Sequence, residues 1–382
     1  MRRAILLFLF IVTTAGWLPA DEPAITYTVS VPAPQTHRFL VQLDINGIKE
    51  PSVNLSMPVW STGAYWVLDF AGNVSELEVV NDAGERLDWK KIDKNTWRID
   101  TQGAESIKVS YVVYSREARI VRSYVNARAG HILGSSLLMF MDGQTVRPAS
   151  LELKLPDGWK VSNGAIPIQE NPYRFEFANY DALVDTPMLI GRHSEYTYEV
   201  GGVLHVVAIE GESDLDHEAF VDGTRKLAEA ANELFGGLPY DKYCFILFLS
   251  PRGGGGLEHA NGTTMGSRAW GFSQDPKRLE RLLDLTSHEY FHTWNVKHIQ
   301  PHVFKPYDYD RETETGFLWF SEGVTEYYTD QLLLRAGIYF ETPRHGGTDS
   351  ISVTRSSQSM PSAYETRRLS SSSSSSRNPV TR

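Results

Sequence analysis

The stretch LLDLTSHEYFHTWNV, residues 282–296, is the strongest indication of the fold of the second half of this chain. We expect a helix from about Pro276 through Lys297 to carry it. His288 and His292 are four residues apart, so their side chains leave one face of that helix one turn apart. Two imidazoles placed in this way can bind a single tetrahedral Zn²⁺ ion.

The side chain of Glu289 points about 100° further around the same helix. From there its carboxylate can reach a water on the metal without binding the metal, as a general base must. A bound zinc ion lowers the pKa of that water to about 7. The motif also arises by chance, and the alternative is an amphipathic helix with two core or surface histidines.

A third ligand is expected from Glu322, which lies in the helical pattern LWFSEGVTEYY (318–328). We expect that helix from about Thr315 to Arg335. Two histidines and one carboxylate leave a fourth metal position open for water. The rival third ligands are Glu312 and Glu314, which rank below Glu322 because they lie in a polar loop or helix start.

Two carboxylates are candidates for orienting a ligand histidine. Glu326 lies one turn after Glu322 and is placed to accept a hydrogen bond from a ligand histidine. The alternative for Glu326 is a solvated position on the helix surface. Asp284, one turn before His288, is the second candidate for the same role.

The composition restricts the class of protein. The chain has 382 residues, 41% of them hydrophobic and 22% charged, as in a soluble globular protein of two or three domains. Its net charge of −10 and the absence of a basic stripe argue against nucleic-acid binding. With one cysteine, Cys244, neither an intrachain disulfide nor a Cys-rich metal site is possible. We expect Cys244 to be buried in its apolar run.

The first twenty residues have the pattern of a signal peptide. Arg2 and Arg3 precede an apolar run, Ala4 to Thr13, and an acidic pair follows Ala20. We therefore expect a secreted or periplasmic protein with no membrane span after cleavage. An uncleaved N-terminal anchor is the alternative, although the run is short for a spanning helix.

The rest of the chain divides into three parts. Residues 21–195 contain short runs of period-two alternation separated by turn residues, which predicts an antiparallel β domain, either a sandwich or a saddle-shaped sheet. Residues 196–340 combine strands with helices and predict an α+β catalytic domain. In it we expect a helix at 213–235, a strand at 243–249 and a glycine-rich loop at 252–256. The serine-rich stretch 341–382 is expected to be a disordered tail.

Four motifs together resemble the glycyl aminopeptidase family of zinc metallopeptidases, in the gluzincin clan. They are GGGLEHANG (254–262), HEYFHTWNVKHIQP (288–301), PYDYDRE (306–312) and LWFSEGVTEYY (318–328). The resemblance implies an N-terminal β domain followed by a thermolysin-like catalytic domain. It implies one Zn²⁺ per chain bound by His288, His292 and Glu322, with Glu289 as the catalytic base and a peptide as the substrate.

The glycine-rich motif carries a further expectation. Glu258 is similar to the glutamate of a related Gly-x-Met-Glu-Asn motif that holds the free α-amino group of a substrate, although its neighbours match only in part. Gly255 and Gly256 would let the substrate backbone approach, and the segment could pair with it as an edge strand. The alternative is a structural turn with an exposed glutamate.

The resemblance stops near Gly337. The family continues into a helical domain, with a tyrosine that stabilises the oxyanion, and often into a PDZ domain. We therefore expect a C-terminally truncated chain with an incomplete catalytic domain. The leading hypothesis is a zinc aminopeptidase, and the alternative is a catalytically impaired peptide-binding or scaffold protein that retains the metal site. No feature of the sequence indicates an oligomeric state.

Overall fold

The structure is a computed structural model that describes residues 25–64, 66–168 and 171–338. The expected signal peptide and the expected tail lie outside the described residues. The first part of the described chain is built on a seven-stranded sheet with the neighbour order β13-β14-β11-β1-β2-β7-β4. Its strands are β1 (Ile25–Ser30), β2 (Arg38–Asn46), β4 (Val74–Asn81), β7 (Ser106–Tyr114), β11 (Ala149–Lys154), β13 (Pro167–Ile168) and β14 (Asn171–Phe177).

The core side of this sheet is formed by every second residue of its strands. In β2 the side chains of Phe39, Val41, Leu43 and Ile45 are all buried, whereas those between them are partly or fully exposed. Period-two alternation places one set of side chains on the core face. The expected antiparallel domain is confirmed for most of the ladder, but β1 pairs with β11 in parallel.

Two smaller sheets complete the N-terminal region. One has the order β10-β3-β6-β5 and the other β12-β15-β9-β8. Their strands are β3 (Ser52–Ser56), β5 (Trp89–Lys91), β6 (Thr96–Asp100), β8 (Tyr124–Val125), β9 (Ala129–Ile132), β10 (Phe140–Met141), β12 (Lys160–Asn163) and β15 (Met188–Gly191). The short helix α1 (Tyr180–Val184) begins after Asn179, whose side chain accepts from the Ala182 N–H.

The second region contains a five-stranded sheet with the order β16-β17-β18-β20-β19. The inner strands β17, β18 and β20 pair in parallel, and the two edge strands are antiparallel to their neighbours. The strands are β16 (Ser194–Val200), β17 (Val203–Glu210), β18 (Lys242–Ser250), β19 (Gly256–His259) and β20 (Gly262–Arg268). The expected glycine-rich loop therefore leads into an edge strand.

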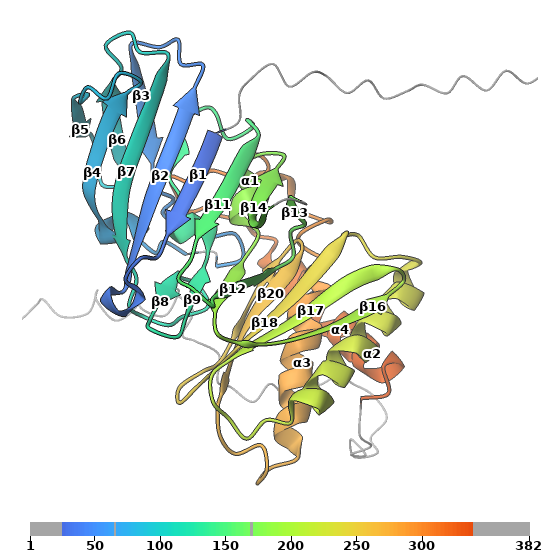
Figure 1. Cartoon of the computed structure of the whole chain (residues 1–382). Coiled ribbons are helices and arrows are strands. Elements are labelled where there is room, and N and C mark those ends of the chain that lie inside the picture. The colour runs from blue at the N-terminus through green and yellow to red at the C-terminus, as the bar shows by residue number, and fades with distance from the viewer. Residues whose placement is uncertain (1–24, 65, 169–170, 339–382) are drawn as a thin grey trace, which may run out of the picture. The chain divides into compact units, whose positions relative to one another are not determined.

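Three helices cover one face of this sheet, as Figure 1 shows for α2 (His217–Phe235), α3 (Lys277–Phe291) and α4 (Leu318–Arg335). Tyr243, Phe245 and Leu247 of β18 share a core with these helices. The residues between them face the other way: Cys244, Ile246 and Phe248 pack with Tyr124 and Leu189 of the N-terminal region. Burial on both faces explains the unbroken apolar run of β18 and confirms that Cys244 is buried.

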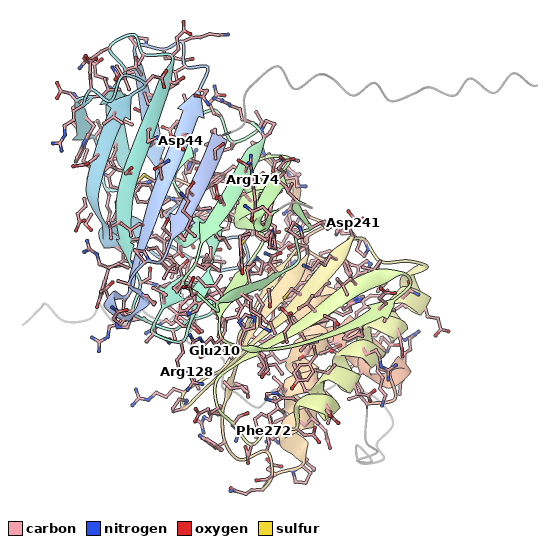
Figure 2. The ribbon with its side chains drawn as sticks, in the orientation of Figure 1. Asp44, Arg128, Arg174, Glu210, Asp241 and Phe272 are labelled. Atoms are coloured by element: carbon pink, nitrogen blue, oxygen red, sulfur yellow. The ribbon has the colours of Figure 1, made fainter. Side chains whose placement is uncertain are left out.

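Polar contacts reinforce this junction. Arg128 donates to Glu212 at 2.8 Å, and the Tyr124 hydroxyl donates to Glu210 at 3.3 Å. In Figure 2 the labelled Arg128 and Glu210 are neighbours at this junction. None of the helices in the described part of the chain has the length and apolar content needed to cross a bilayer.

The α3 helix is shorter than its sequence predicts. It ends at Phe291 rather than near Lys297, with His292 as its C-cap. The chain then folds back, so that the Lys297 N–H donates to the His292 carbonyl at 3.1 Å. The Asn295 carbonyl accepts from His292 Nδ1 at 2.9 Å, and this local contact takes the place of a further helical turn.

Candidate metal centre and active site

Three side chains from α3 and α4 meet at one point. His288 Nε2 and His292 Nε2 are 3.2 Å apart. The Glu322 Oε2 atom lies 3.4 Å from His288 Nε2 and 3.9 Å from His292 Nε2. The i, i+4 spacing on α3 brings the two imidazoles together, and the packing of α4 against α3 supplies the carboxylate.

These separations fit a tetrahedral metal ion. Donor atoms held about 2.0–2.1 Å from zinc at tetrahedral angles lie about 3.3 Å from one another. The three distances bracket that value, and a His₂Glu donor set suits Zn²⁺. The two rival ligands of the sequence analysis, Glu312 and Glu314, are exposed in the segment before α4. Neither belongs to a group of candidate ligands among the described residues.

Each histidine is oriented through its other ring nitrogen. His292 Nδ1 donates to the Asn295 carbonyl at 2.9 Å, and the Thr325 hydroxyl lies 3.2 Å from the same nitrogen. The Glu326 carboxylate lies 3.3 Å from His288 Nδ1. A donor at Nδ1 leaves the Nε2 lone pair directed at the metal position. The structure thus places Glu326 against the ring, and it exposes the other candidate, Asp284, to solvent.

Asn295 connects the two ligand helices and was not foreseen from the sequence. Its side-chain amide is buried and donates to the Ser321 carbonyl at 2.9 Å and to the Thr325 hydroxyl at 3.1 Å. Ser321 directly precedes Glu322, so this amide fixes the start of α4 relative to His292. The only signal in the sequence was its position three residues after a ligand histidine.

The charges of the site favour a cation. Burial alone would lower the pKa of His288, but hydrogen bonds to Glu322 and Glu326 outweigh it and raise the pKa to about 10. Carboxylates that stabilise a proton there would also stabilise a divalent ion. Burial raises the pKa of Glu289, and the negative charges of Glu258 and Glu322 act in the same direction.

Two buried carboxylates lie beside the metal position. One oxygen of Glu258, one oxygen of Glu289 and one ring nitrogen of His292 all lie within 4.8 Å of one another. Glu258 and Glu289 are only 5% and 6% exposed. Glu258 is therefore a buried residue of edge strand β19, unlike the exposed turn residue of the alternative interpretation.

The glycines before Glu258 differ in their surroundings. Gly256 lies against Glu289, because a Cβ atom built on it would be 2.3 Å from the Glu289 carboxyl carbon. Gly255 has a φ of +81°, and its carbonyl accepts from the Gly266 N–H at 2.9 Å. At Gly256 there is no room for a side chain, and at Gly255 the positive φ disfavours any residue that has one.

Comparison with known families gives two matches to one family. The Peptidase M61 N-terminal domain matches residues 26–192, and M61 glycyl aminopeptidase matches residues 281–378. No curated protein matches the sequence.

Among solved structures, the chain is similar to an aminopeptidase N family protein from Idiomarina loihiensis. The identity is 31% and the TM-score 0.77, over 82% of this chain and 55% of that one. The chain therefore spans about half the length of that relative.

A second similarity is to an M1 zinc metallopeptidase from Deinococcus radiodurans, with a TM-score of 0.42 and 15% identity over 71% of this chain and 64% of that one. A mutant of that enzyme bound to a Tyr-Ser-Ala substrate has a TM-score of 0.44 and 15% identity, over 72% of this chain and 64% of that one. At these TM-scores neither structure supports a statement about this chain.

Proposed function

The chain belongs to the M61 glycyl aminopeptidase family, and on that premise we propose that it is a zinc-dependent aminopeptidase that hydrolyses the N-terminal bond of peptides. The observation that carries the proposal is the convergence of His288, His292 and Glu322 at distances suited to one tetrahedral ion. Two buried carboxylates beside that position supply the groups that an aminopeptidase needs in addition.

His288, His292 and Glu322 would hold one zinc ion per chain. The second group of candidate ligands shares His292 with the first, and that ring has one nitrogen directed at the site. Two ions could therefore not both have a complete set of three protein ligands at the same time. When bound, zinc supplies Lewis-acid chemistry, which polarises a carbonyl and makes water more acidic.

Glu289 is proposed as the general base. Its carboxylate accepts a proton from the attacking water and passes it to the leaving amine. A carboxylate whose pKa is raised by burial holds that proton more readily between the two steps. The close approach of Gly256 limits where the carboxylate can lie.

Glu258 is proposed to bind the α-ammonium group of the substrate. It lies on β19, whose only pairing in the sheet of the described chain is with β20, so the outer edge can pair with an extended peptide. An ion pair between Glu258 and the terminal ammonium would place the first peptide bond at the metal. Position along the chain, rather than side-chain identity, would then select the bond that is cleaved.

Export to the periplasm or the cell exterior is proposed from the N-terminal pattern of Arg2, Arg3 and the apolar run after them. N-terminal sequencing of the mature protein from the producing cell tests this point. A new N-terminus near Asp21 is the expected result, and an intact Met1 on membrane-bound protein would indicate an uncleaved anchor.

The proposed activity is tested with purified full-length chain and a dipeptide in free and N-acetylated forms. We expect about one zinc ion per chain, cleavage of the free form, loss of cleavage with a chelator and recovery on adding zinc. Zinc binding and peptide binding without chelator-sensitive cleavage would favour a peptide-binding protein instead. A chain that binds no zinc would contradict both.

Replacing Gly256 by Ala is expected to lower kcat by about 10²-fold or more, with zinc retained. The added methyl group would occupy the space of the Glu289 carboxylate, which must move, and misplacement of a base by about 1 Å has a cost of this order. The measurement is kcat together with bound zinc. The matched control is Gly254→Ala, since a Cβ at Gly254 meets no atom within 4 Å. Equal rates for the two variants would contradict the expectation.

A further inference from the structure

A partly buried carboxylate of the N-terminal region lies at the end of the strand that carries Glu258. Asp185 follows helix α1, and its side chain is 16% exposed. One of its oxygens, Oδ2, accepts from the Ala260 N–H at 3.0 Å. The other, Oδ1, lies 3.1 Å from His259 Nδ1 and 3.2 Å from the Thr62 hydroxyl. Asp185 therefore holds the two residues that directly follow Glu258.

The same turn has further contacts with the N-terminal region. The Asn261 side chain donates to the Thr186 hydroxyl at 3.1 Å. A Cβ on Gly164 would be 1.8 Å from the Asn261 carbonyl oxygen, so the two backbones are in close contact. These contacts make Asp185 a fixed point of the structure rather than a mobile surface carboxylate.

The strongest partner of Asp185 is Lys297, in the segment after the ligand helix α3. Its ammonium donates to Asp185 Oδ1 at 2.7 Å, and its side chain is only 3% exposed. The Thr62 hydroxyl lies 3.4 Å from the same nitrogen. Lys297 and Asp185 therefore form a buried ion pair, which is costly to break by removing one partner alone.

Lys297 and Glu258 lie around the same small pocket. Lys297 and Gly63 line the same small pocket, together with Thr62 and Tyr307. A Cβ on Gly63 would be 2.8 Å from Glu258 Oε2, so Glu258 lies directly against the wall of that pocket. Burial alone would lower the pKa of Lys297, but nearby groups, chiefly the negative charge of Asp185 and also that of Glu258, outweigh burial and raise it. A lysine side chain has the length and freedom to change partner within such a pocket.

We propose that Asp185 is a positioning residue for amine recognition: it keeps the Lys297 ammonium away from Glu258, so that the Glu258 carboxylate stays available for the α-ammonium group of a peptide. This inference rests on the proposed function, because it takes Glu258 as the group that binds the substrate amine. Through Asp185, the N-terminal region would contribute to substrate binding, although Asp185 itself touches neither metal nor substrate.

The test measures binding rather than turnover, in the full-length Glu289→Gln protein loaded with zinc. The probes are alanyl-alanine and its N-acetyl form, and the readout is the ratio of their two dissociation constants. The parent is expected to prefer the free amine by about 10-fold or more, since an ion pair to a buried carboxylate is lost on acetylation. Adding Glu258→Gln is expected to remove the preference and serves as the reference.

Adding Asp185→Asn is expected to lower the preference by about 10-fold, because Lys297 then pairs with Glu258. Adding Asp185→Asn and Lys297→Met together is expected to restore it, and replacing both members of a buried ion pair is generally tolerated. The matched control is Asp181→Asn, on the short helix α1 that directly precedes Asp185. Asp181 accepts from the Tyr309 hydroxyl at 2.7 Å, and an amide can still do so.

An Asp185→Asn protein that keeps the full preference would overturn the inference while leaving the proposed function intact, as would a double variant no better than Asp185→Asn. A parent with no preference for the free amine would overturn both. If Asp185→Asn yields no folded protein, a crystal structure of the Glu289→Gln protein with alanyl-alanine decides. Lys297 on Asp185 with the ligand ammonium on Glu258 supports the inference, and Lys297 paired with Glu258 overturns it.

Discussion

Replacing Glu289 by Gln is expected to lower kcat/KM by about 10²–10⁴-fold while the chain keeps one zinc ion. Gln has nearly the shape of Glu and fits the space beside Gly256, but it cannot accept the proton of the attacking water. The three proposed ligands are unchanged, so the metal should remain. The measurements are steady-state kinetics on a free dipeptide and the zinc content of the same preparation.

The control for this substitution is Glu233→Gln, which removes one negative charge from an exposed position of α2. It should leave both the rate and the zinc content unchanged. Two results would contradict the assignment of Glu289. A variant with an almost normal rate would show that another group is the base. A variant that loses zinc would show that Glu289 binds the metal, as its place in the second group of candidate ligands allows.

Replacing His288 by Ala is expected to abolish both zinc binding and turnover. Two ligands would remain, and a structural or catalytic zinc site in a protein has three or more protein ligands. The measurement is a zinc titration at equilibrium, with the activity of the same sample. Retention of tight zinc binding would show that the ion is held elsewhere, for example by Glu258, Glu289 and His292.

The informative comparison for His288→Ala is Glu326→Gln. Glu326 contacts the far nitrogen of the same ring, at 3.3 Å, and does not reach the metal position in the proposed set. Loss of such a partner typically weakens metal affinity by about 10–100-fold, so zinc should bind at higher concentration and activity should return with it. Equal behaviour of the two variants would mean that Glu326 is itself a ligand.

The fold class predicted from the sequence is confirmed, and so is the family resemblance. Both rest on local patterns. The alternation in β2 and β7 determines which side chains are buried, because neighbours in a strand point to opposite faces. The unbroken apolar run of β18 predicted a strand with Cys244 buried, and the structure buries both faces of that strand, between the helices and the N-terminal region.

The end of α3 shows where local patterns stop being sufficient. The sequence continues with residues that a helix tolerates, and the predicted helix ran to about Lys297. In the structure the chain leaves the helix at His292, since the Asn295 carbonyl is needed to bind His292 Nδ1. The Asn295 side chain in turn donates to the Ser321 carbonyl of α4, so the boundary accompanies a contact between α3 and α4 that helix propensity cannot report.

By itself, the sequence determined the pair His288 and His292 and the position of Glu289 between them. Their relation is a property of one helix turn, which any α-helix reproduces. Only the tertiary structure decided which distant groups join them. The sequence ranked Glu322 above Glu312 and Glu314, but only the packing of α4 on α3 brings its carboxylate to the histidines, and only the fold connects Glu258 to Asp185 of the N-terminal region through the turn after β19. The reason is physical: these contacts depend on the packing of separate elements, and no spacing along the chain encodes that packing.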